Sequence, residues 1–556
     1  MSLQPRSVPP VPEETARIAR AVFGPQHPYL KLRDELGPLF QDDLFAELFP
    51  TRGQPAEAPW RLALVTLLQF AEGLSDRQAA DAVRSRLDWK YLLSLEVTDP
   101  GFHYSVLSEF RDRLVVHQAS RLLFDTLLAR CRERQWLKSR GRQRTDSTHV
   151  LSAVRNLSRL ELVGETLRHV LDVLAVAVPN WLVQHSFPAW VERYGVSFAT
   201  ARLPRATAER ERLAQQMGAD GWYLWQALGA DLAPAGGREL PAVVTLHRVW
   251  LQQYTWEEAP PGGTPRLRWR ETEELPPASE RLVSPHDPDA RYAKKREVGW
   301  SGYKVHFTET CEADQPLLIT EVQTTPATRD DSELLPGIQE QLTQRELLPA
   351  THLVDTGYVE GSTLLGSQQR QVDLLGPDQG DTSGQARANG GFAAQDFRID
   401  WEAQQVTCPG GKESVGWRER QERGRPVIRV HFARGDCGPC PHRPDCTHSE
   451  AGGRQLVFPA REVHAVLQAA RERATTPEFA QQYAARAGVE GTHSQAVRRC
   501  GLRRARYVGY AKVQLQHLLT GAALNLVRVA DWLCAQPRAR TRVTAFARSM
   551  VAAGVS

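Results

Sequence analysis

Hydrophobic residues in the first part of the chain recur at helical spacing. Between Pro59 and Gly73 the leucines follow this spacing, and Ala79 and Val83 continue it after a short polar turn. A helix brings residues three and four apart onto one face, so this pattern predicts amphipathic helices. The segment 105–114 repeats it. Residues 1 to about 130 are therefore predicted to be helical.

The turn between the first two of these helices carries Ser75, a residue that caps helix N-termini well. Two short helices across a tight turn are typical of a helix-turn-helix DNA-binding unit. A small helical bundle with no DNA-binding role gives the same pattern. The pattern alone leaves both interpretations open.

The hydrophobic period changes to two from Gly302 onward, which predicts strands. A second strand is expected at 317–322, and shorter ones at 144–150, 352–355 and 372–375. A helix is expected at 331–347, and the segment 257–290, rich in Pro, Gly and Glu, is expected to be a loop. Strands alternating with helices predict an α/β unit with a large helical insertion after its first strand.

Composition narrows the class of protein. Hydrophobic residues make up 41% and charged residues 24% of the 556, which excludes a wholly disordered, collagenous or membrane-embedded chain. The net charge of +4 is too small to indicate a nucleic-acid partner by itself. Only 8 of the 69 basic residues are lysines. Arginine suits bidentate phosphate contacts, although an arginine-biased genome would give the same composition.

The first 23 residues carry no apolar signal segment, and the longest apolar run, 170–183, is interrupted by polar residues. A cytoplasmic protein without membrane contact is therefore expected. Four of the eight cysteines cluster in sequence, and in such a compartment a cluster favours metal over disulfides. A structural zinc site is predicted from these four, with His442 and His448 as alternative ligands; the four are Cys408, Cys437, Cys440 and Cys446. A reduced cluster that holds no metal is the alternative.

The segment around these cysteines, 401–450, has few apolar residues and many Gly, Pro and Arg. It is not expected to bury a core of its own, so zinc would supply its folding energy. The other cysteines, at 131, 311, 500 and 534, are scattered and are expected to be packing residues.

Three acidic residues stand out by position. Asp146 lies within a predicted strand, Asp355 ends another, and Glu490 shares a helix face with Tyr483 and Arg486 on the helix that begins at about residue 477. Carboxylates at neighbouring strand ends can reach one pair of Mg²⁺ ions, with a third supplied by a helix.

Each of the three acids also has a local alternative. Asp146 could form a turn with the Ser that follows it, Asp355 could cap a turn before Gly357, and Glu490 could only pair with Arg486. The acids in the segment 330–331 compete for a catalytic role but are expected to cap a helix.

Four strings carry a resemblance to a known family: RTDSTHV, SPHDPDARYAKKREVGWSGYKVHFTET, HLVDTGYVEGS, and TPEFAQQYAARAGVEGTHSQAVRRCGLRRARYVGYAKVQLQHLLTGAALNLVR. They resemble the DDE-type insertion-sequence transposases, most closely the IS eleven-eighty-two group. The N-terminal strings FAEGLSDRQAADAVRSRLDWKYLLSL and GFHYSVLSEFRDRL are similar to that family's helical N-terminal domain. The resemblance covers most of residues 40–535.

The resemblance implies an α/β, ribonuclease H-like mixed sheet with helices, preceded by an all-helical DNA-binding domain. It maps the catalytic, metal-binding triad onto Asp146, Asp355 and Glu490, and the family's Tyr-Arg-Glu signature onto Tyr483 and Arg486. The expected domains are 1–135, helical and DNA-binding; 140–150 with 298–376, the first part of the catalytic core; 151–297, a helical insertion and linker; 377–474, an insertion with the zinc knob; 475–535, helices that complete the core; and 536–556, a tail.

Basic residues near these motifs are candidate DNA contacts. The stretch 498–506 holds five arginines, and clustered arginines beside a carboxylate site suit a DNA backbone. The alternative is a solvated surface run without a ligand. The seventh residue after Glu490, often Lys in the family, is Val497 here. The candidate phosphate contacts are Lys294, Lys295, Arg296, Lys304, Arg498, Arg499, Arg503, Arg504, Arg506 and Lys512, with Tyr483 and Arg486 beside the triad.

The expected function is therefore transposition: binding of terminal inverted repeats, cleavage at the element ends and joining of the 3′-hydroxyl ends to target DNA, using two Mg²⁺ or Mn²⁺ ions. A homodimer on double-stranded DNA is expected, in the bacterial cytoplasm at the nucleoid. The alternatives are an inactive, domesticated copy that only binds DNA, and a ribonuclease H-like nuclease without strand transfer.

Overall fold

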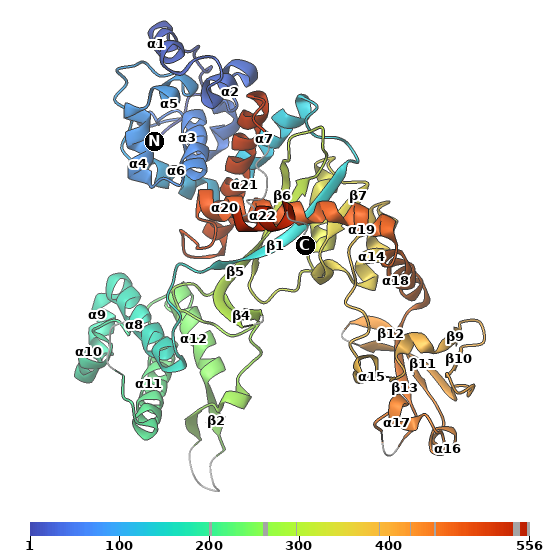
Figure 1. Ribbon diagram of the computed structural model, residues 1–556. Coiled ribbons are helices and arrows are strands. Elements are labelled where there is room, and N and C mark those ends of the chain that lie inside the picture. The colour runs from blue at the N-terminus through green and yellow to red at the C-terminus, as the bar shows by residue number, and fades with distance from the viewer. Residues whose placement is uncertain are drawn as a thin grey trace.

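The computed structural model describes residues 1–198, 203–258, 265–295, 297–388, 390–422, 424–449, 452–537 and 545–552. In Figure 1 a central sheet carries the N-terminal helices above it, and two separate insertions hang below it, one on each side. Among the described residues, no helix is long and apolar enough to cross a membrane.

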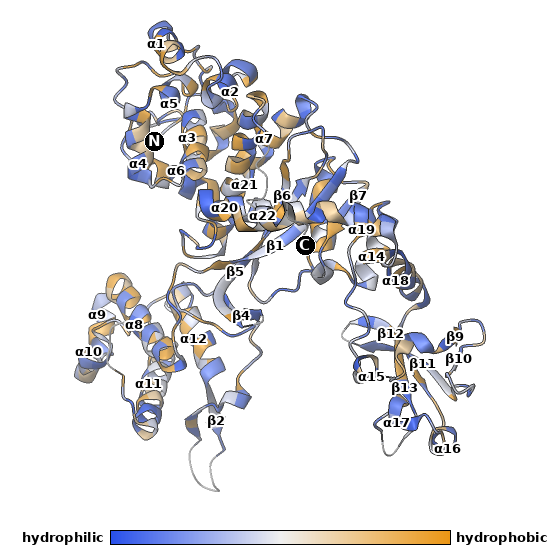
Figure 2. Cartoon of the chain, viewed as in Figure 1, coloured by the Kyte–Doolittle hydropathy of each residue, from blue (hydrophilic) through white to orange (hydrophobic). Residues whose placement is uncertain are grey.

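The residues before the first strand form helices, as predicted. These are α1 (Glu13–Phe23), α2 (Pro28–Leu36), the 3₁₀ helix η1 (Asp42–Leu48), α3 (Pro59–Glu72), α4 (Asp76–Ser85), α5 (Leu87–Leu92), α6 (Ser105–Val116) and α7 (Leu122–Glu133). Ser75 caps α4 in a capping box with Gln78. Helix α3 is buried over most of its length and is hydrophobic in Figure 2.

A long C-terminal helix, α21 (Tyr510–Leu533), joins these helices to the sheet. It packs against α2, α3 and α7 on one side and against strand β6 (Ile319–Pro326) on the other. One hydrophobic core consequently runs from the N-terminal helices through α21 into the sheet.

The central sheet is mixed, which confirms the α/β class and is consistent with a ribonuclease H-like fold. Its order is β4 (Arg291–Lys295), β5 (Val298–Thr310), β1 (Arg142–Leu151), β7 (Thr351–Val354) and β8 (Asp373–Leu375), with β6 also paired to β5. Strand β1 runs antiparallel to β5 and parallel to β7. Helices α13 (Leu335–Gln344) and α14 (Gly361–Gln369) and the 3₁₀ helix η3 (Thr356–Tyr358) lie along its connections.

The first insertion is helical, as expected, but it ends in a hairpin that the sequence did not predict. Its helices are α8 (Arg159–Ala177), α9 (Pro179–Gln184), α10 (Pro188–Tyr194), α11 (Thr207–Ala227) and α12 (Pro241–Gln253), and they bury a core of their own. The expected loop contains β3 (Arg266–Trp269), which pairs with β2 (Tyr254–Glu257), and the short η2 (Thr272–Glu274). Tyr254 and Trp269 pack edge to face, so aromatic packing outweighs the surrounding Pro and Gly.

The second insertion has a small hydrophobic core, so the expectation that it buries none is wrong. Strands β11 (Gly416–Glu422), β12 (Arg425–His431) and β13 (Gln455–Pro459) form a small sheet, with the hairpin β9 (Arg398–Asp400) and β10 (Gln405–Thr407) beside it. Alternate residues, including Ile428, Val430 and Phe458, enclose a hydrophobic cluster. The exposed face of these strands is rich in Arg and Glu, which hid the alternation. Short helices complete it: α15 (Gly384–Arg387), η4 (Ala394–Asp396), α16 (Arg434–Cys437) and α17 (Arg443–Cys446).

The chain returns to the sheet through α18 (Arg461–Ala474) and α19 (Pro477–Tyr483). Thr476 caps α19, as its sequence predicts. The expectation that Glu490 shares this helix is wrong. A 3₁₀ segment, η5 (Ala484–Ala487), intervenes, and Glu490 belongs to α20 (Gly488–Cys500). The described chain ends with α22 (Ala545–Ala552).

Candidate active site

Three carboxylates meet around one arginine at the middle of the sheet. Arg486 lies in η5, and its Nη2 is 2.8 Å from Asp146 Oδ2 and 3.7 Å from Asp355 Oδ2. Its Nη1 is 2.9 Å from Glu490 Oε1. Acids from β1, from the end of β7 and from α20 therefore surround a single guanidinium group, although they are far apart in sequence.

Strand register explains why the two aspartates meet. Strands β1 and β7 are parallel neighbours, and Thr145 pairs with Val354. Asp146 and Asp355 are the next residues on their strands, so their backbones lie side by side at the point where β7 ends. Beneath them, Thr145 Oγ1 is 2.6 Å from His352 Nε2, which ties the two strands together through side chains.

Each carboxylate also makes the local turn or ion-pair contact that the sequence offered as an alternative to a catalytic role. Asp146 accepts a hydrogen bond from the backbone N–H of Ser147 at 2.8 Å, and Asp355 accepts one from that of Gly357 at 2.9 Å. Glu490 pairs with Arg486. These contacts orient the carboxylates, and they coexist with the convergence around the arginine.

A buried ion cluster fixes α20 against the sheet. Glu309 of β5 is fully buried, and its carboxylate lies 2.6 Å from Arg144 Nη2 and 2.8 Å from Arg528 Nη1. Thr492 of α20 donates a third bond to it at 2.6 Å. A Cβ atom on Gly488 would lie 2.0 Å from the Arg144 guanidinium, which is held by Glu309. Glycine at the first residue of α20 thus allows the helix that carries Glu490 to approach β1.

Burial controls the charge state of the site. Burial is the main cause that raises the pKa of Asp146 to about 6, helped by the neighbouring carboxylate of Asp355 and opposed by Arg486. His493 of α20 stacks on Phe307, and burial lowers its pKa to about 4, so it is neutral at pH 7.

A fourth carboxylate beside this group was not selected from the sequence. Asp331 was expected to cap a helix, but α13 begins four residues later, and the Asp331 carboxylate instead accepts from Ser147 Oγ at 3.0 Å and from Lys304 Nζ at 2.9 Å. A Cβ atom on Gly357 would lie 3.2 Å from Asp355 Oδ1 and 3.4 Å from Asp331 Oδ2, so both carboxylates line the space beside this glycine. The sequence around Asp331 gave no sign of this role, because its contact with Lys304 depends on how β5 is placed in the sheet.

The arginine stretch that follows α20 is partly turned inward. Three of its five arginines donate to carbonyls outside α20: Arg499 to Ala71, Arg503 to His149 and Arg506 to Leu74. They hold the end of α20 against α3 and β1. Arg498 and Arg504 are exposed and remain candidates for contact with a ligand.

The other predicted basic contacts differ in their surroundings. Lys304 pairs with Asp331, Lys512 lies 2.9 Å from Asp112, and Lys294 lies 3.7 Å from Glu297. Lys295 is exposed and close enough to Asp146 to lower the pKa of that carboxyl. Arg296 lies outside the described residues. Tyr483 stacks on Phe479 at 5.3 Å between ring centroids, at the edge of the site.

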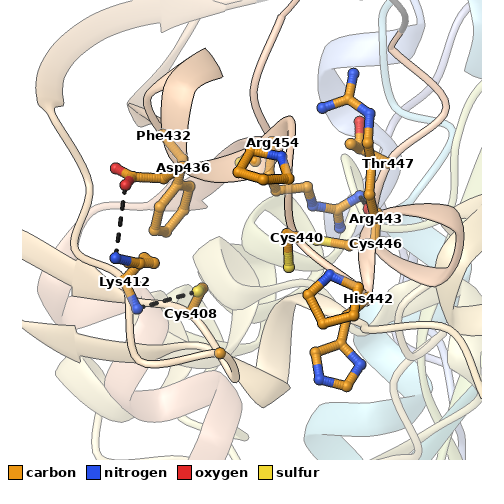
Figure 3. Close-up of a pocket in the computed structure, with 14 residues that line it drawn as sticks. Cys408, Lys412, Phe432, Asp436, Cys440, His442, Arg443, Cys446, Thr447 and Arg454 are labelled. Carbon is orange, nitrogen blue, oxygen red and sulfur yellow. Dashed lines mark hydrogen bonds and ion pairs between the residues drawn. The ribbon is translucent and has the colours of Figure 1, made fainter.

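The four clustered cysteines line one cavity of about 310 Å³ in the second insertion. In Figure 3 the sulfur atoms of Cys408, Cys440 and Cys446 point toward this cavity. The Lys412 N–H donates to Cys408 Sγ at 3.3 Å. Burial, and then the neighbouring thiols, raise the pKa of Cys446. His442 lines the same cavity, whereas His448 does not.

The carboxylate site and the cysteine cavity can each be compared with what a metal ion requires. Within the described ranges, no three His, Cys, Asp or Glu side chains lie close enough together to hold an ion. At the carboxylates, Arg486 stands between the groups. Their chemistry nevertheless fits a hard divalent cation, since they offer only oxygen ligands and the three carboxylates share a single arginine. The four thiols fit zinc in number and type.

Two family models match the chain. Residues 18–113 match a model described as "Transposase domain (DUF772)", and residues 407–530 match one described as "Transposase DDE domain". The second match includes Glu490, Arg486 and the four cysteines, but neither aspartate of the candidate triad. No curated protein and no solved structure gives a significant match.

Proposed function

From the premise that this chain is a DDE-type insertion-sequence transposase, we propose that it binds the terminal inverted repeats of its element, cleaves the DNA at the element ends and joins the freed 3′-hydroxyl groups to target DNA. The two matches do not distinguish the IS eleven-eighty-two group from other groups. The family implies DNA as the partner, whereas binding of the terminal repeats, cleavage and joining are what we propose.

One observation carries this proposal: the meeting of Asp146, Asp355 and Glu490 around Arg486. Isolated carboxylates in these positions would each be satisfied by a local turn or ion pair. Three that share one cation, at the junction of two parallel strands and a helix, need long-range contacts such as the Glu309 cluster to hold them. Such an arrangement supports a catalytic role.

The three carboxylates are proposed to hold Mg²⁺ or Mn²⁺. Two such ions, when bound, supply charge that stabilises both the attacking and the leaving oxygen of a phosphoryl transfer. In this proposal Asp146 and Asp355 are ligands fixed by the strands, while Glu490, exposed over 66% of its side chain, closes the site from α20. Arg486 keeps the carboxylates together and is placed to contact a DNA phosphate.

The remaining parts have proposed roles in holding DNA. Helices α1–α7 form a DNA-binding domain that reads the terminal repeats, and Arg498, Arg504 and Lys295 contact the backbone near the carboxylates. The two ends of an element must be brought together, so a homodimer on DNA is proposed. The cavity lined by the four cysteines is proposed to hold a structural zinc ion remote from catalysis.

The test is a joining assay with the full chain, labelled duplexes carrying the element ends, and a target plasmid in Mg²⁺. We expect labelled DNA to become covalently joined to the plasmid. Cleavage without joining would identify a nuclease and contradict the strand-transfer step. Binding without cleavage would contradict the enzymatic proposal and identify a DNA-binding protein.

A further inference from the structure

A groove of about 1180 Å³ lies between α11 and the β2–β3 hairpin of the first insertion, away from the carboxylate site. Arginine dominates its lining. The arginines come from the start of α8, from α11 and the residues before it, and from the hairpin: Arg159, Arg205, Arg210, Arg212, Arg266, Arg268 and Arg270. Only two carboxylates, Glu211 and Glu271, share the lining. The groove therefore has a large excess of positive charge.

Almost none of this charge is neutralised within the protein. Among the described residues, Arg268 alone of these arginines forms an ion pair, with Glu274 at 2.7 Å. Arg159 donates instead to neutral acceptors, Gln253 Oε1 and the Arg270 carbonyl, both at 2.9 Å. Burial lowers the pKa of Arg159 and outweighs the opposing effects of Tyr254 and of the Glu271 carboxylate, which is near but not paired with it. Unpaired guanidinium groups of this kind are stabilised by an incoming anion.

The walls of the groove are held rigidly. Tyr254 Oη donates to the Ala214 carbonyl at 2.7 Å, which fixes β2 to α11. A Cβ atom on Gly218 would lie 2.5 Å from the Tyr254 ring, so helix and hairpin are in close contact there. Trp269 packs into the core of the insertion, and Arg159 stacks over its ring. The arginines are thus presented on a preformed surface, which reduces the entropy cost of binding.

We propose that this groove binds the phosphate backbone of double-helical DNA. The inference rests on the proposed function, and it assigns a DNA contact to a part of the chain that neither family match covers. Arginines spread over two helices and a hairpin match a row of phosphates rather than one small anion, because duplex DNA carries a charge about every 1.7 Å along its axis. The groove offers few neutral hydrogen-bonding side chains for reading bases, so binding is independent of sequence.

The position of the insertion supports this proposal. The insertion leaves the core directly after β1, the strand that carries Asp146, and rejoins it at β4 beside Lys295. Figure 1 shows it projecting from the sheet on the side opposite the N-terminal helices. DNA held in the groove would therefore extend the contact beyond the residues nearest the carboxylates.

The test compares charge reversal inside and outside the groove. Arg210→Glu changes an exposed arginine on α11, and Arg248→Glu changes an exposed arginine on α12 of the same insertion, which is not part of the groove lining. Binding to a duplex with the element end and to an unrelated duplex of equal length is measured over a range of salt. We expect Arg210→Glu to weaken both complexes at least about tenfold at 0.1 M salt, and Arg248→Glu to change them less than about twofold.

A combined variant measures how many phosphates the groove neutralises. Replacing Arg205, Arg210 and Arg266 by Gln is expected to reduce the slope of log K against log salt by about 2 to 3, near 0.9 for each phosphate that is no longer neutralised. Equal binding by Arg210→Glu and Arg248→Glu overturns the proposal, as does a weakening confined to the element end. Failure of the unaltered protein to bind either duplex would instead contradict the proposed function, and circular dichroism confirms that each variant is folded.

Discussion

The carboxylate site and the cysteine cavity are both candidate metal sites, but the fold holds them in different ways. Asp146, Asp355 and Glu490 come from three separate elements. Strand pairing joins β1 to β7, and the buried Glu309 joins β1 to α20 through Arg144 and Thr492. The cysteines all lie within one short insertion, between residues 408 and 446, around a small core. The first site is prepared by the whole fold. The second depends on local chain connections and, in our proposal, on zinc.

The largest expected effect is loss of catalysis at the carboxylate site. Asp355→Asn keeps the shape of the side chain but removes its charge, so cleavage and joining should fall below detection while DNA binding remains. Asp373→Asn on the neighbouring strand β8 is the control, because Asp373 is exposed and pairs with Arg473. Joining by Asp355→Asn at the level of the control would exclude this carboxylate from the site.

The next largest effect is expected on the stability of the fold, when the buried Glu309 cluster near the carboxylates is disrupted. Glu309→Gln leaves Arg144 and Arg528 buried without their carboxylate, and such a loss costs about 3–5 kcal/mol of unfolding free energy. Glu133→Gln, on the exposed surface of α7, should change stability by less than about 0.5 kcal/mol. Chemical denaturation measures both. Similar stabilities for the two variants would show that the cluster does not hold the site together.

Acid should weaken the sheet through its buried histidines. Burial lowers the pKa of His352 to about 4, so the unfolded chain binds a proton on this group at a higher pH than the folded one. Its contribution is present above pH 6.5 and is lost as the pH falls from 6.5 toward 4, up to about 3 kcal/mol. Thermal denaturation at pH 7 and pH 5 should show this loss, and His352→Gln should reduce the difference. If His352→Gln loses as much thermal stability between pH 7 and pH 5 as the unaltered protein does, His352 is not the source of the loss.

Removal of a cysteine should have the most local effect. Cys437→Ser should lower the zinc content of protein purified without chelator, and hydrogen exchange should increase between residues 398 and 459 and not in the central sheet. Cys311→Ser, outside the insertion, is the control and should retain the metal. Less than half an equivalent of zinc in the unaltered protein would contradict the zinc proposal.

Sequence reasoning found the parts of this molecule that depend on local order. The strand pattern placed Asp146 within a strand and Asp355 at the end of another, and the four-residue spacing paired Arg486 with Glu490, although they lie on η5 and α20 rather than on one helix. It missed Asp331 because the partners of that residue, Lys304 and Ser147, come from other strands. Contacts between distant elements leave no periodic trace in a single sequence.

The same limit explains the other errors. The strands of the β2–β3 hairpin are only four residues each, and β11 of the second insertion is exposed and polar over most of its length, so neither shows a clear alternation of apolar and polar residues. Three arginines predicted to contact phosphate donate to carbonyls of neighbouring elements instead. Charge density along a sequence does not say which side of a helix faces the protein.

Metal-directed cleavage of the protein chain tests whether three distant carboxylates form one metal site. Fe²⁺ replaces Mg²⁺, and ascorbate with peroxide produces hydroxyl radicals that cut the backbone close to the bound ion. A shared site predicts cuts near residues 146, 355 and 490 in the DNA complex, all suppressed together by excess Mg²⁺. Cuts near only one of the three, or cuts that Mg²⁺ does not suppress, would contradict it.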